Sequence, residues 1–428
     1  MIHRHAAAVH RGLALCAFAA VLAAVSAAPL AGQTPAKPPA FSLAFSGYIK
    51  TDIFTDSRQT TSIREGHYLL FPKGPALDPD GADINARGSF HILSIQTRAA
   101  LKITGPDALG AKTSGYVEAE FFGTSDADLN GLRLRHGYLK LNWPRTELMI
   151  GQFWHPLFVV ECFPDVVSFN TGAPFLPFNR SPQVRVTQAF GRLSLAATAL
   201  AQRDFTSNGP DGASSVYLRN AARPELNLKL QFAAKNDKRK TETVAGVGGD
   251  LMTIAPRIAT ASGYATEEKV SGAAAMAFFK QKWPKWTWKA EAVWGQNLHH
   301  LTMLGGYGVR DVLDPVRLDW SYTPVATFSA WTEVQTNGGP WQTGLFAGYS
   351  KNLGSTHEIT GATYSRGANI DELYRLSPRL LYNAGKVRLA GEVELTAASY
   401  GTPDLYGKVQ GARFVRNVRL LLAAYYFF

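Results

Sequence analysis

The stretch RLLLAAYYFF, residues 419–428, shows the alternation with which the prediction of the fold begins. Apolar side chains stand at every second position, which are Val418, Leu420, Leu422, Ala424, Tyr426 and Phe428. The positions between them include Asn417, Arg419 and Tyr425. A repeat of two residues places such sets on opposite faces of a β-strand. We therefore expect a terminal strand with one apolar face and one polar face.

The same alternation recurs along the chain. Within residues 225–232, an apolar set of Leu226, Leu228, Leu230 and Phe232 alternates with Glu225, Asn227, Lys229 and Gln231. Over residues 89–104 we expect one strand on which Leu93, Ile95, Ala99, Leu101 and Ile103 oppose Ser94, Gln96, Arg98 and Lys102. Strands of a soluble β-sandwich also alternate, so the pattern alone does not distinguish a sandwich from a membrane barrel.

The lengths of the connections favour a membrane barrel. Tight turns are expected at 143–145, 191–192, 283–286, 337–340 and 383–386, and long polar or Gly-rich stretches at 55–88, 154–182, 204–223, 297–324, 352–372 and 399–411. Alternating short and long connections are typical of transmembrane barrels, whose turns are tight on one side only. Trp143, Trp283, Trp286 and Trp341 lie at or beside the tight turns, as expected for an interfacial aromatic girdle.

We therefore predict an all-β, transmembrane antiparallel barrel of sixteen strands, because such a sheet must close in lipid. The strands are expected near 42–54, 89–104, 114–124, 131–143, 146–153, 184–190, 193–203, 224–234, 242–250, 269–282, 286–296, 325–337, 341–351, 373–383, 387–398 and 412–428. Eighteen are possible if 242–250 and the loop-borne segment 356–366 are misread. The even number puts both chain ends on the tight-turn side.

The front of the chain predicts export. A basic start, an apolar run over 13–28 and small residues after it indicate a signal peptide over residues 1–32, followed by a short periplasmic segment over 33–41. Removing residues 1–32 takes away Arg4 and Arg11, so 42 basic against 33 acidic residues leave a charge of +9. Cys162 is then the single cysteine, which excludes an intramolecular disulfide.

Three segments carry a resemblance to known proteins. GLRLRHGYLKLNWP (131–144), ELMIGQFWHPLF (147–158) and PFNRSPQVRVTQAFGRLSLAATA (177–199) resemble the DcaP-like porins of Gram-negative outer membranes. The resemblance implies a trimeric, sixteen-stranded diffusion channel that is general or prefers anions. The aromatic residues Tyr426 and Phe428 resemble the C-terminal signal that the barrel-assembly machinery reads. QTPAKPPA, residues 33–40, has no heptads, so the coiled coil of some members is not expected.

The stretch 154–182 is expected to fold into the barrel lumen. It carries many aromatic residues that need burial, together with four prolines, which are Pro156, Pro164, Pro174 and Pro177. Because a barrel of sixteen strands encloses a wide pore, an inward loop would constrict it. The alternative is an aromatic loop packed on a neighbouring subunit.

Strand parity predicts which charges face the lumen, where they set selectivity. The expected pore-lining basic residues are Arg98, Arg133, Arg135, Arg180, Arg185, Arg379, Arg413 and Arg419, with Lys102 and Arg388 on the same faces. The inward acids are Glu118, Glu120, Glu291, Glu333, Glu392 and Glu394, and Glu161 and Asp165 lie on the internal loop. We expect the loop acids to face a basic wall. Alternatively, these arginines are structural or bridge lipopolysaccharide phosphates. His136 is expected outward, at a subunit contact.

These patterns predict an outer-membrane porin for small hydrophilic, preferentially anionic solutes. Its expected partners are outer-membrane lipid, lipopolysaccharide, the barrel-assembly machinery and two further copies of the chain, and nucleic acid is not expected. The alternatives are a barrel enzyme of lipase or protease type and a non-conducting barrel. The sequence has no G-x-S-x-G and no H-E-x-x-H motif. We expect no cofactor and no metal, because adjacent His299 and His300 would point oppositely on a strand and no third ligand is suitably spaced.

Overall fold

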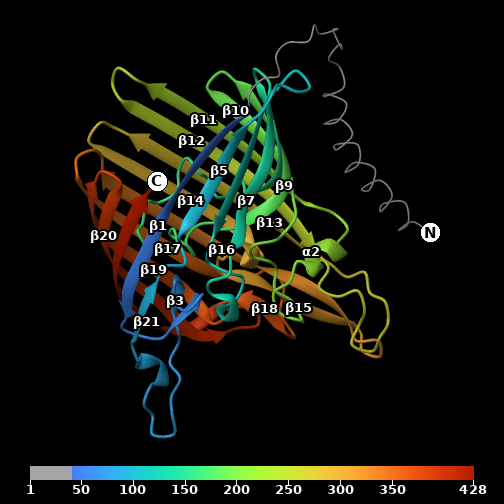
Figure 1. Cartoon of the computed structure of the whole chain (residues 1–428). Helices are drawn as coiled ribbons and strands as arrows, with labels where there is room; N and C mark the ends of the chain where they lie inside the picture. Colours follow the sequence, from blue (N-terminus) through green and yellow to red (C-terminus); the bar gives the residue numbers. More distant parts are fainter. Residues whose placement is uncertain (1–40) are drawn as a thin grey trace.

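The structure, a computed structural model, describes residues 41–428. The predicted signal peptide (1–32) and nearly all of the predicted segment 33–41 lie outside these residues. Within them, sixteen strands form a closed antiparallel barrel, as predicted (Figure 1). Antiparallel pairing of the first and last strands closes the barrel, with Tyr48 opposite Phe427. No helix of residues 41–428 is long and apolar enough to cross a membrane.

The barrel strands follow the chain order around the ring. They are β1 (Ser42–Asp56), the two-part strand β4 (Ser89–Leu93) and β5 (Arg98–Thr104), β6 (Lys112–Glu120), β7 (Arg133–Asn142), β8 (Thr146–Trp154), β9 (Arg180–Phe190), β10 (Leu193–Leu200), β11 (Glu225–Asn236), β12 (Thr241–Ile254), β13 (Val270–Lys282), β14 (Trp286–Gln296), β16 (Asp319–Thr336), β17 (Trp341–Ser355), β19 (Ile370–Ala384), β20 (Val387–Pro403) and β21 (Val409–Phe427).

The remaining elements belong to the long connections. A hairpin of β2 (Thr60–Ile63) and β3 (Tyr68–Pro72) follows β1, and β15 (Gly305–Asp314) pairs with both β16 and β18 (Thr363–Arg366). The helices are short: η1 (Ile84–Ala86), η2 (Asp126–Asp128), α2 (Val216–Asn220) and η3 (His299–Leu301). The segment 356–366 is therefore a loop-borne extension, as expected, while 242–250 is part of β12.

Alternation produces the expected two faces. On β11, Leu226, Leu228 and Leu230 are 49%, 54% and 42% exposed and face outward, whereas Glu225 and Asn227 are buried. Val418, Leu420, Leu422, Tyr426 and Phe428 form the same outward apolar row on β21 and at the chain end. In a bilayer, this outer surface would contact the apolar lipid chains. Because the barrel is closed, each of its strands pairs its backbone groups with two neighbours, as a membrane-spanning sheet must.

The strand predicted over 89–104 is interrupted. Residues 94–97 form a turn between β4 and β5, and both parts pair with β1. The turn changes the parity, so Leu93 and Ile95 are buried inside the barrel rather than sharing the outward face of Ala99, Leu101 and Ile103. Periodicity cannot reveal this turn because both halves alternate correctly on their own.

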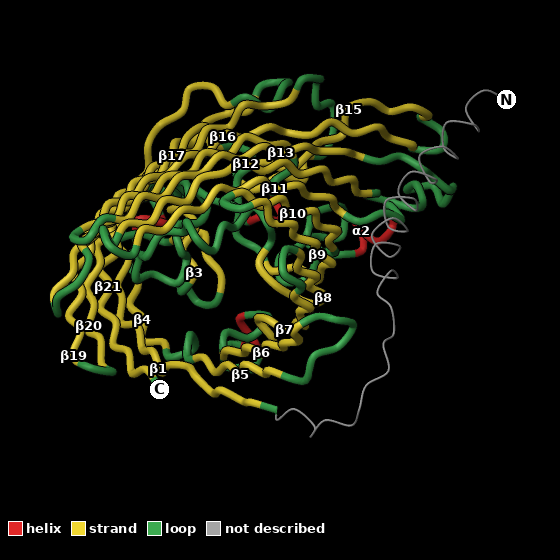
Figure 2. Tube along the Cα trace, turned by 90° about the horizontal axis from the view of Figure 1, so that it is seen from above, coloured by secondary structure: helices red, strands yellow, loops and turns green. Residues whose placement is uncertain are grey.

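Two long connections fill the lumen. The internal loop, residues 155–179, runs inside the ring of strands, as predicted, and the β2–β3 hairpin joins it there (Figure 2). Aromatic rings form a lumen cluster, in which Tyr68 of the hairpin and Phe169 and Phe178 of the internal loop are joined by Phe122, after β6, and Phe205, after β10. Phe122 and Phe169 stack with ring centroids 4.0 Å apart. Side chains therefore fill much of the barrel interior around the lumen cluster, which lies between the two ends of the barrel.

Candidate functional site

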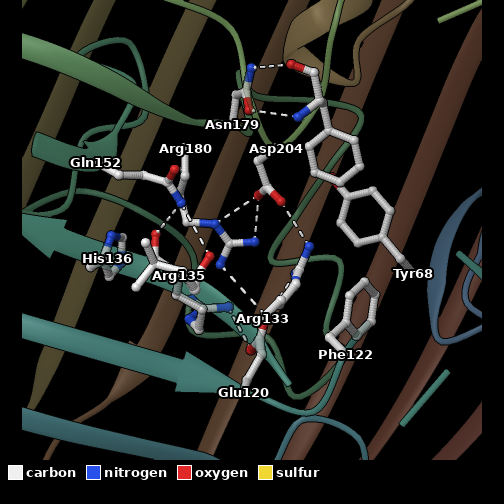
Figure 3. A network of polar contacts seen from close by, with 12 residues as sticks. Tyr68, Glu120, Phe122, Arg133, Arg135, His136, Gln152, Asn179, Arg180 and Asp204 are labelled. Carbon is white, nitrogen blue, oxygen red and sulfur yellow. Dashed lines mark hydrogen bonds and ion pairs between the residues drawn. The ribbon is translucent and has the colours of Figure 1, made fainter. Parts of the chain in front are cut away.

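A cluster of arginines and acids covers the inner face of β6 to β9. Glu118 and Glu120 lie on the inner face of β6, and pairing of β6 with β7 puts Arg133 opposite Glu120. Arg180 opens β9, and Asp204 follows β10 in the long connection 201–224. Inward alternation on adjacent strands, together with Asp204, thus brings contact partners that are 13 to 71 positions apart in the sequence into one network (Figure 3).

The network is held by short, charge-assisted contacts. Arg135 reaches Glu118 Oε1 through Nε and Glu120 Oε2 through Nη1, both at 2.6 Å. Arg133 joins Glu120 Oε1 at 2.7 Å to Asp204 Oδ1 at 2.8 Å. Two further guanidinium groups complete the network: Arg180 Nε donates to Asp204 Oδ2 at 2.7 Å, and Arg98 Nη2 donates to Glu120 Oε2 at 3.1 Å. Four guanidinium groups therefore share three carboxylates, which leaves one positive charge.

Aromatic rings hold the guanidinium planes. The guanidinium carbons of Arg135 and Arg180 lie 5.6 Å and 5.1 Å from the ring centroid of Trp154. That of Arg133 lies 4.5 Å from the centroid of Phe122 in the lumen cluster. Such cation–π contacts orient the side chains without neutralising them, so the excess charge persists.

Asp204 is the member of the network that lies outside the membrane-spanning strands. Burial alone raises the pKa of this carboxyl group, but Arg180 and Arg133 outweigh burial and hold the pKa below its ordinary value. Asp204 is therefore ionised across the neutral range and belongs in the charge count.

A β-bulge corrects the predicted direction of His136. Glu118 pairs with His136 and Ala119 with Leu134, so Arg135 is the extra residue of β7. The bulge lets two consecutive side chains, Arg135 and His136, both point inward. His136 is 4% exposed and contacts the rings of Phe153 and Trp154, so the predicted outward position is wrong.

The network forms one side of a cavity of about 620 Å³ on the tight-turn side of the lumen cluster. We call it the charged cavity. Its lining includes three permanently charged basic residues, Arg98, Arg135 and Arg388, and two acidic residues, Glu118 and Asp165. Arg388 donates to Asn383 Oδ1 at 2.8 Å, and within residues 41–428 it forms no ion pair. The lining therefore carries a net charge of +1, from three positive and two negative groups.

The opposite wall binds the internal loop. Glu392 accepts the backbone N–H groups of Val167 at 2.7 Å and Ser168 at 3.1 Å. Glu333 accepts the N–H of Asp165 at 2.9 Å, and Arg375 donates to the carbonyl oxygen of Ala173 at 2.7 Å. Inward acids of β16 and β20 thus serve as acceptors for loop backbone that would otherwise be buried without partners.

The remaining predicted site residues lie in different surroundings. Arg185 donates to the carbonyl oxygen of Trp154 at 2.9 Å, and Arg379 binds Glu333 at 2.7 Å. Arg419 is fully buried against Asp56 at 2.6 Å, whereas Arg413 is exposed near the long-loop end of β21.

The two loop acids also differ. Asp165 pairs with Lys289 of β14 at 2.6 Å, and Glu161 is exposed. Arg133, Arg135 and Arg180 bind acids of their own wall and Asp204, rather than either loop acid.

Tyr426 and Phe428 face outward, where Phe428 stacks on Phe45 at 5.4 Å. Sequence reasoning missed Asp204, which lies in a polar connection without alternation, and Lys289, whose inward parity on β14 was available as a signal.

Comparisons with solved structures agree with this architecture. The structure is similar to the outer membrane channel DcaP of Acinetobacter baumannii, with a TM-score of 0.66 and 16% identity over 91% of this chain and 97% of that chain. It is similar to an anion-selective porin from Comamonas acidovorans, with a TM-score of 0.54 and 9% identity over 91% and 100%. OmpT of Vibrio cholerae gives 0.52 and 12% over 92% and 99%.

No protein-family model matches the sequence, and no curated protein matches it. The similarity is therefore one of fold. The similarity extends over about nine-tenths or more of both chains, and it confirms the DcaP-like, porin-type fold that the sequence resemblance implied.

Proposed function

We propose that the chain is an outer-membrane diffusion channel that admits small hydrophilic solutes and prefers anions. The observation that carries the proposal is the charged cavity, whose lining has three arginines against two acids. Inside a protein, where the field of a charge is poorly screened, one excess cation biases the ions that enter. Arg98 and Arg135 are proposed as fixed parts of the basic wall and Arg388 as its unpaired member.

The membrane assignment rests on the outer surface and the shared fold. Apolar outward rows such as those on β11 and β21 suit lipid, and the similar solved structures include an outer membrane channel and an outer membrane protein. A trimer is proposed by analogy, because one similar structure, of OmpT with a TM-score of 0.53, is described as a trimer form. Tyr426 and Phe428, both outward, are proposed to act as the assembly signal.

The packed lumen favours a second candidate, a non-conducting barrel. A second cavity, of about 560 Å³, lies on the long-loop side and shares no lining residue with the charged cavity within residues 41–428. Phe169 and Phe178 line the charged cavity, whereas Phe71 and Ile370 line the second.

Solute flux tests the proposal and separates the two candidates. The folded mature chain is inserted into liposomes, and the uptake of glucose, glucuronate and glucosamine is compared, because these sugars are close in size and differ in charge. We expect uptake of all three, with glucuronate fastest. Glucosamine as the fastest solute would overturn the anion preference. Uptake of none, by protein that is shown to be inserted, would overturn the channel in favour of the non-conducting barrel.

A further inference from the structure

A second polar cluster lies at the long-loop end of the barrel, away from the charged cavity. His155 is the first residue of the internal loop, directly after β8, and Glu225 is the first residue of β11. His300 lies in η3, in the connection after β14. Asp250 of β12 joins them, because pairing of β11 with β12 places it opposite Asn227. Four regions of the chain therefore contribute one side chain each.

The side chains converge on one point. His155 Nε2 and His300 Nε2 each lie 2.9 Å from the same atom, Glu225 Oε1. One ligand atom from each of these three residues lies within 4.8 Å of the others. Asp250 Oδ1 is 3.8 Å from His155 Nε2. His155 and Glu225 are fully buried, His300 is 2% exposed and Asp250 is 5% exposed.

The protein alone does not satisfy this cluster. The second carboxylate oxygen of Glu225, Oε2, is buried without a hydrogen-bond partner among the described residues, as is Oδ1 of Asn227. Among residues 41–428, neither Glu225 nor Asp250 forms an ion pair with a lysine or an arginine. Buried carboxylates are stable when they are paired with a cation or coordinate a metal.

We propose that His155, His300 and Glu225 bind a divalent transition-metal ion, with Asp250 or a water molecule as the fourth ligand. Two imidazole nitrogens with one or two carboxylates form the ligand set of tetrahedral Zn²⁺ sites. The sequence expectation of no metal rested on His299 and His300 pointing oppositely on a strand. They lie instead in the turn of η3, where His299 contacts the carbonyl oxygen of Thr206 at 3.2 Å and His300 alone enters the cluster.

Metal binding would fasten both ends of the internal loop. The backbone N–H of His155 donates to the carbonyl oxygen of Asn179 at 3.0 Å, which joins the first and last residues of the loop. The side chain of Asn179 donates to the carbonyl oxygen of His300 at 2.9 Å. Coordination through His155 Nε2 puts the ring proton on Nδ1, so the contact of Nδ1 with the N–H of Leu157, at 3.2 Å, is given up.

Metal analysis of the folded mature chain tests the site independently of conductance. The chain in detergent is stripped with a chelator, dialysed against buffered Zn²⁺ and analysed by elemental mass spectrometry. We expect about one Zn²⁺ per chain, and affinity roughly 100-fold lower in His300→Gln and Glu225→Gln. His357→Gln is the matched control, because His357 is exposed in the connection after β17, and it should bind like the wild type.

Two readouts keep the test decisive if a variant folds poorly. Co²⁺ in the wild type should give the intense visible absorption of a tetrahedral site, and Zn²⁺ should raise the unfolding temperature of the wild type where Mg²⁺ does not. Zn²⁺ content below about 0.1 per chain in the wild type would overturn the proposal, because a site of this ligand set retains the metal through dialysis. Binding that persists unchanged in both folded variants would overturn it as well.

Discussion

The two walls of the lumen use the same kinds of residue for different purposes. On β6 to β9, Arg133 and Arg135 bind acids of their own wall and Asp204, and the network keeps one excess positive charge beside a cavity. On β16 and β20, Glu333 and Glu392 bind the backbone of the internal loop. A side chain that points into the barrel is therefore not necessarily a pore-lining residue. The group that it binds determines whether it anchors the internal loop or faces solute.

Removing an anchor should have the largest effect. In Glu392→Ala, the N–H groups of Val167 and Ser168 lose a shared carboxylate. Two charge-assisted hydrogen bonds at about 1.5–3 kcal/mol each suggest a loss of roughly 3–6 kcal/mol in the free energy of loop attachment. We expect a higher single-channel conductance and faster proteolysis of the loop. Glu291→Gln is the control, since Glu291 is equally buried on the neighbouring wall and binds no loop N–H.

Equal conductance in Glu392→Ala and Glu291→Gln would contradict the anchoring role. A wild-type conductance combined with faster proteolysis would place the limiting constriction elsewhere, for example at the β2–β3 hairpin.

Reversing a free charge in the cavity should invert the ion preference. Arg388→Glu changes the lining from three positive and two negative groups to two and three, which is a net charge of −1. We expect the zero-current potential in a KCl gradient to change sign, with conductance close to that of the wild type. Arg413→Glu makes the same change at an exposed position outside the cavity and should leave the sign unaltered. Similar shifts in both variants would mean that total charge, not the cavity, sets the preference.

Low pH should increase the anion preference by removing the charge of Asp165. Burial pushes the pKa of Asp165 up, and Lys289 more than offsets burial, so the pKa lies below the ordinary 3.8. Because the pKa is lowered, the Asp165 carboxylate stays charged above pH 3.8, and its ion pair contributes fully to the stability of the fold there. The charge and this contribution are both lost as the pH falls through the folded-state pKa. We expect an Asp165-dependent rise in anion preference only below about pH 4, which the zero-current potential measures.

Asp165→Asn serves as the control for the acid effect. This variant should show the raised anion preference at neutral pH and lose the acid-induced rise. An Asp165-dependent rise that begins near pH 6 would contradict the lowered pKa.

A conservative change in the network should have the smallest effect. Arg133→Lys keeps the charge, but a single ammonium group cannot make both of the contacts that the guanidinium makes with Glu120 and Asp204. We expect a loss of about 1–3 kcal/mol in the free energy of unfolding, since one buried contact to a charged group is lost. The zero-current potential should stay unchanged. A shift in that potential would show that the geometry of the network, and not its net charge, controls selectivity.

The sequence predicts the fold well because the barrel depends on local rules. Alternation from Glu225 to Phe232 and tight turns such as 143–145 are set by neighbouring residues, and the sixteen strands follow from them. The same rules fail where one residue changes the parity. The extra Arg135 of β7 turns His136 inward, and the turn at 94–97 buries Leu93 and Ile95.

The site is less predictable because its contacts are long-range. Asp204 meets Arg133 across 71 residues, and Glu392 meets Val167 across 225. The alternation of each strand correctly predicts that Arg133 and Glu392 point inward, but it does not predict which residues they bind. His155, Glu225 and His300 likewise converge from separate parts of the chain, so the spacing of histidines in the sequence gives no indication of the cluster.

We propose that the excess positive charge of the charged cavity sets the ion preference of the channel. The most direct test is the zero-current potential of the wild-type chain in a planar bilayer under a KCl gradient at neutral pH. We expect a conducting channel with a potential of the sign that chloride permeation gives. A potential of the opposite sign would show that acids such as Asp165 dominate the path and would contradict the account.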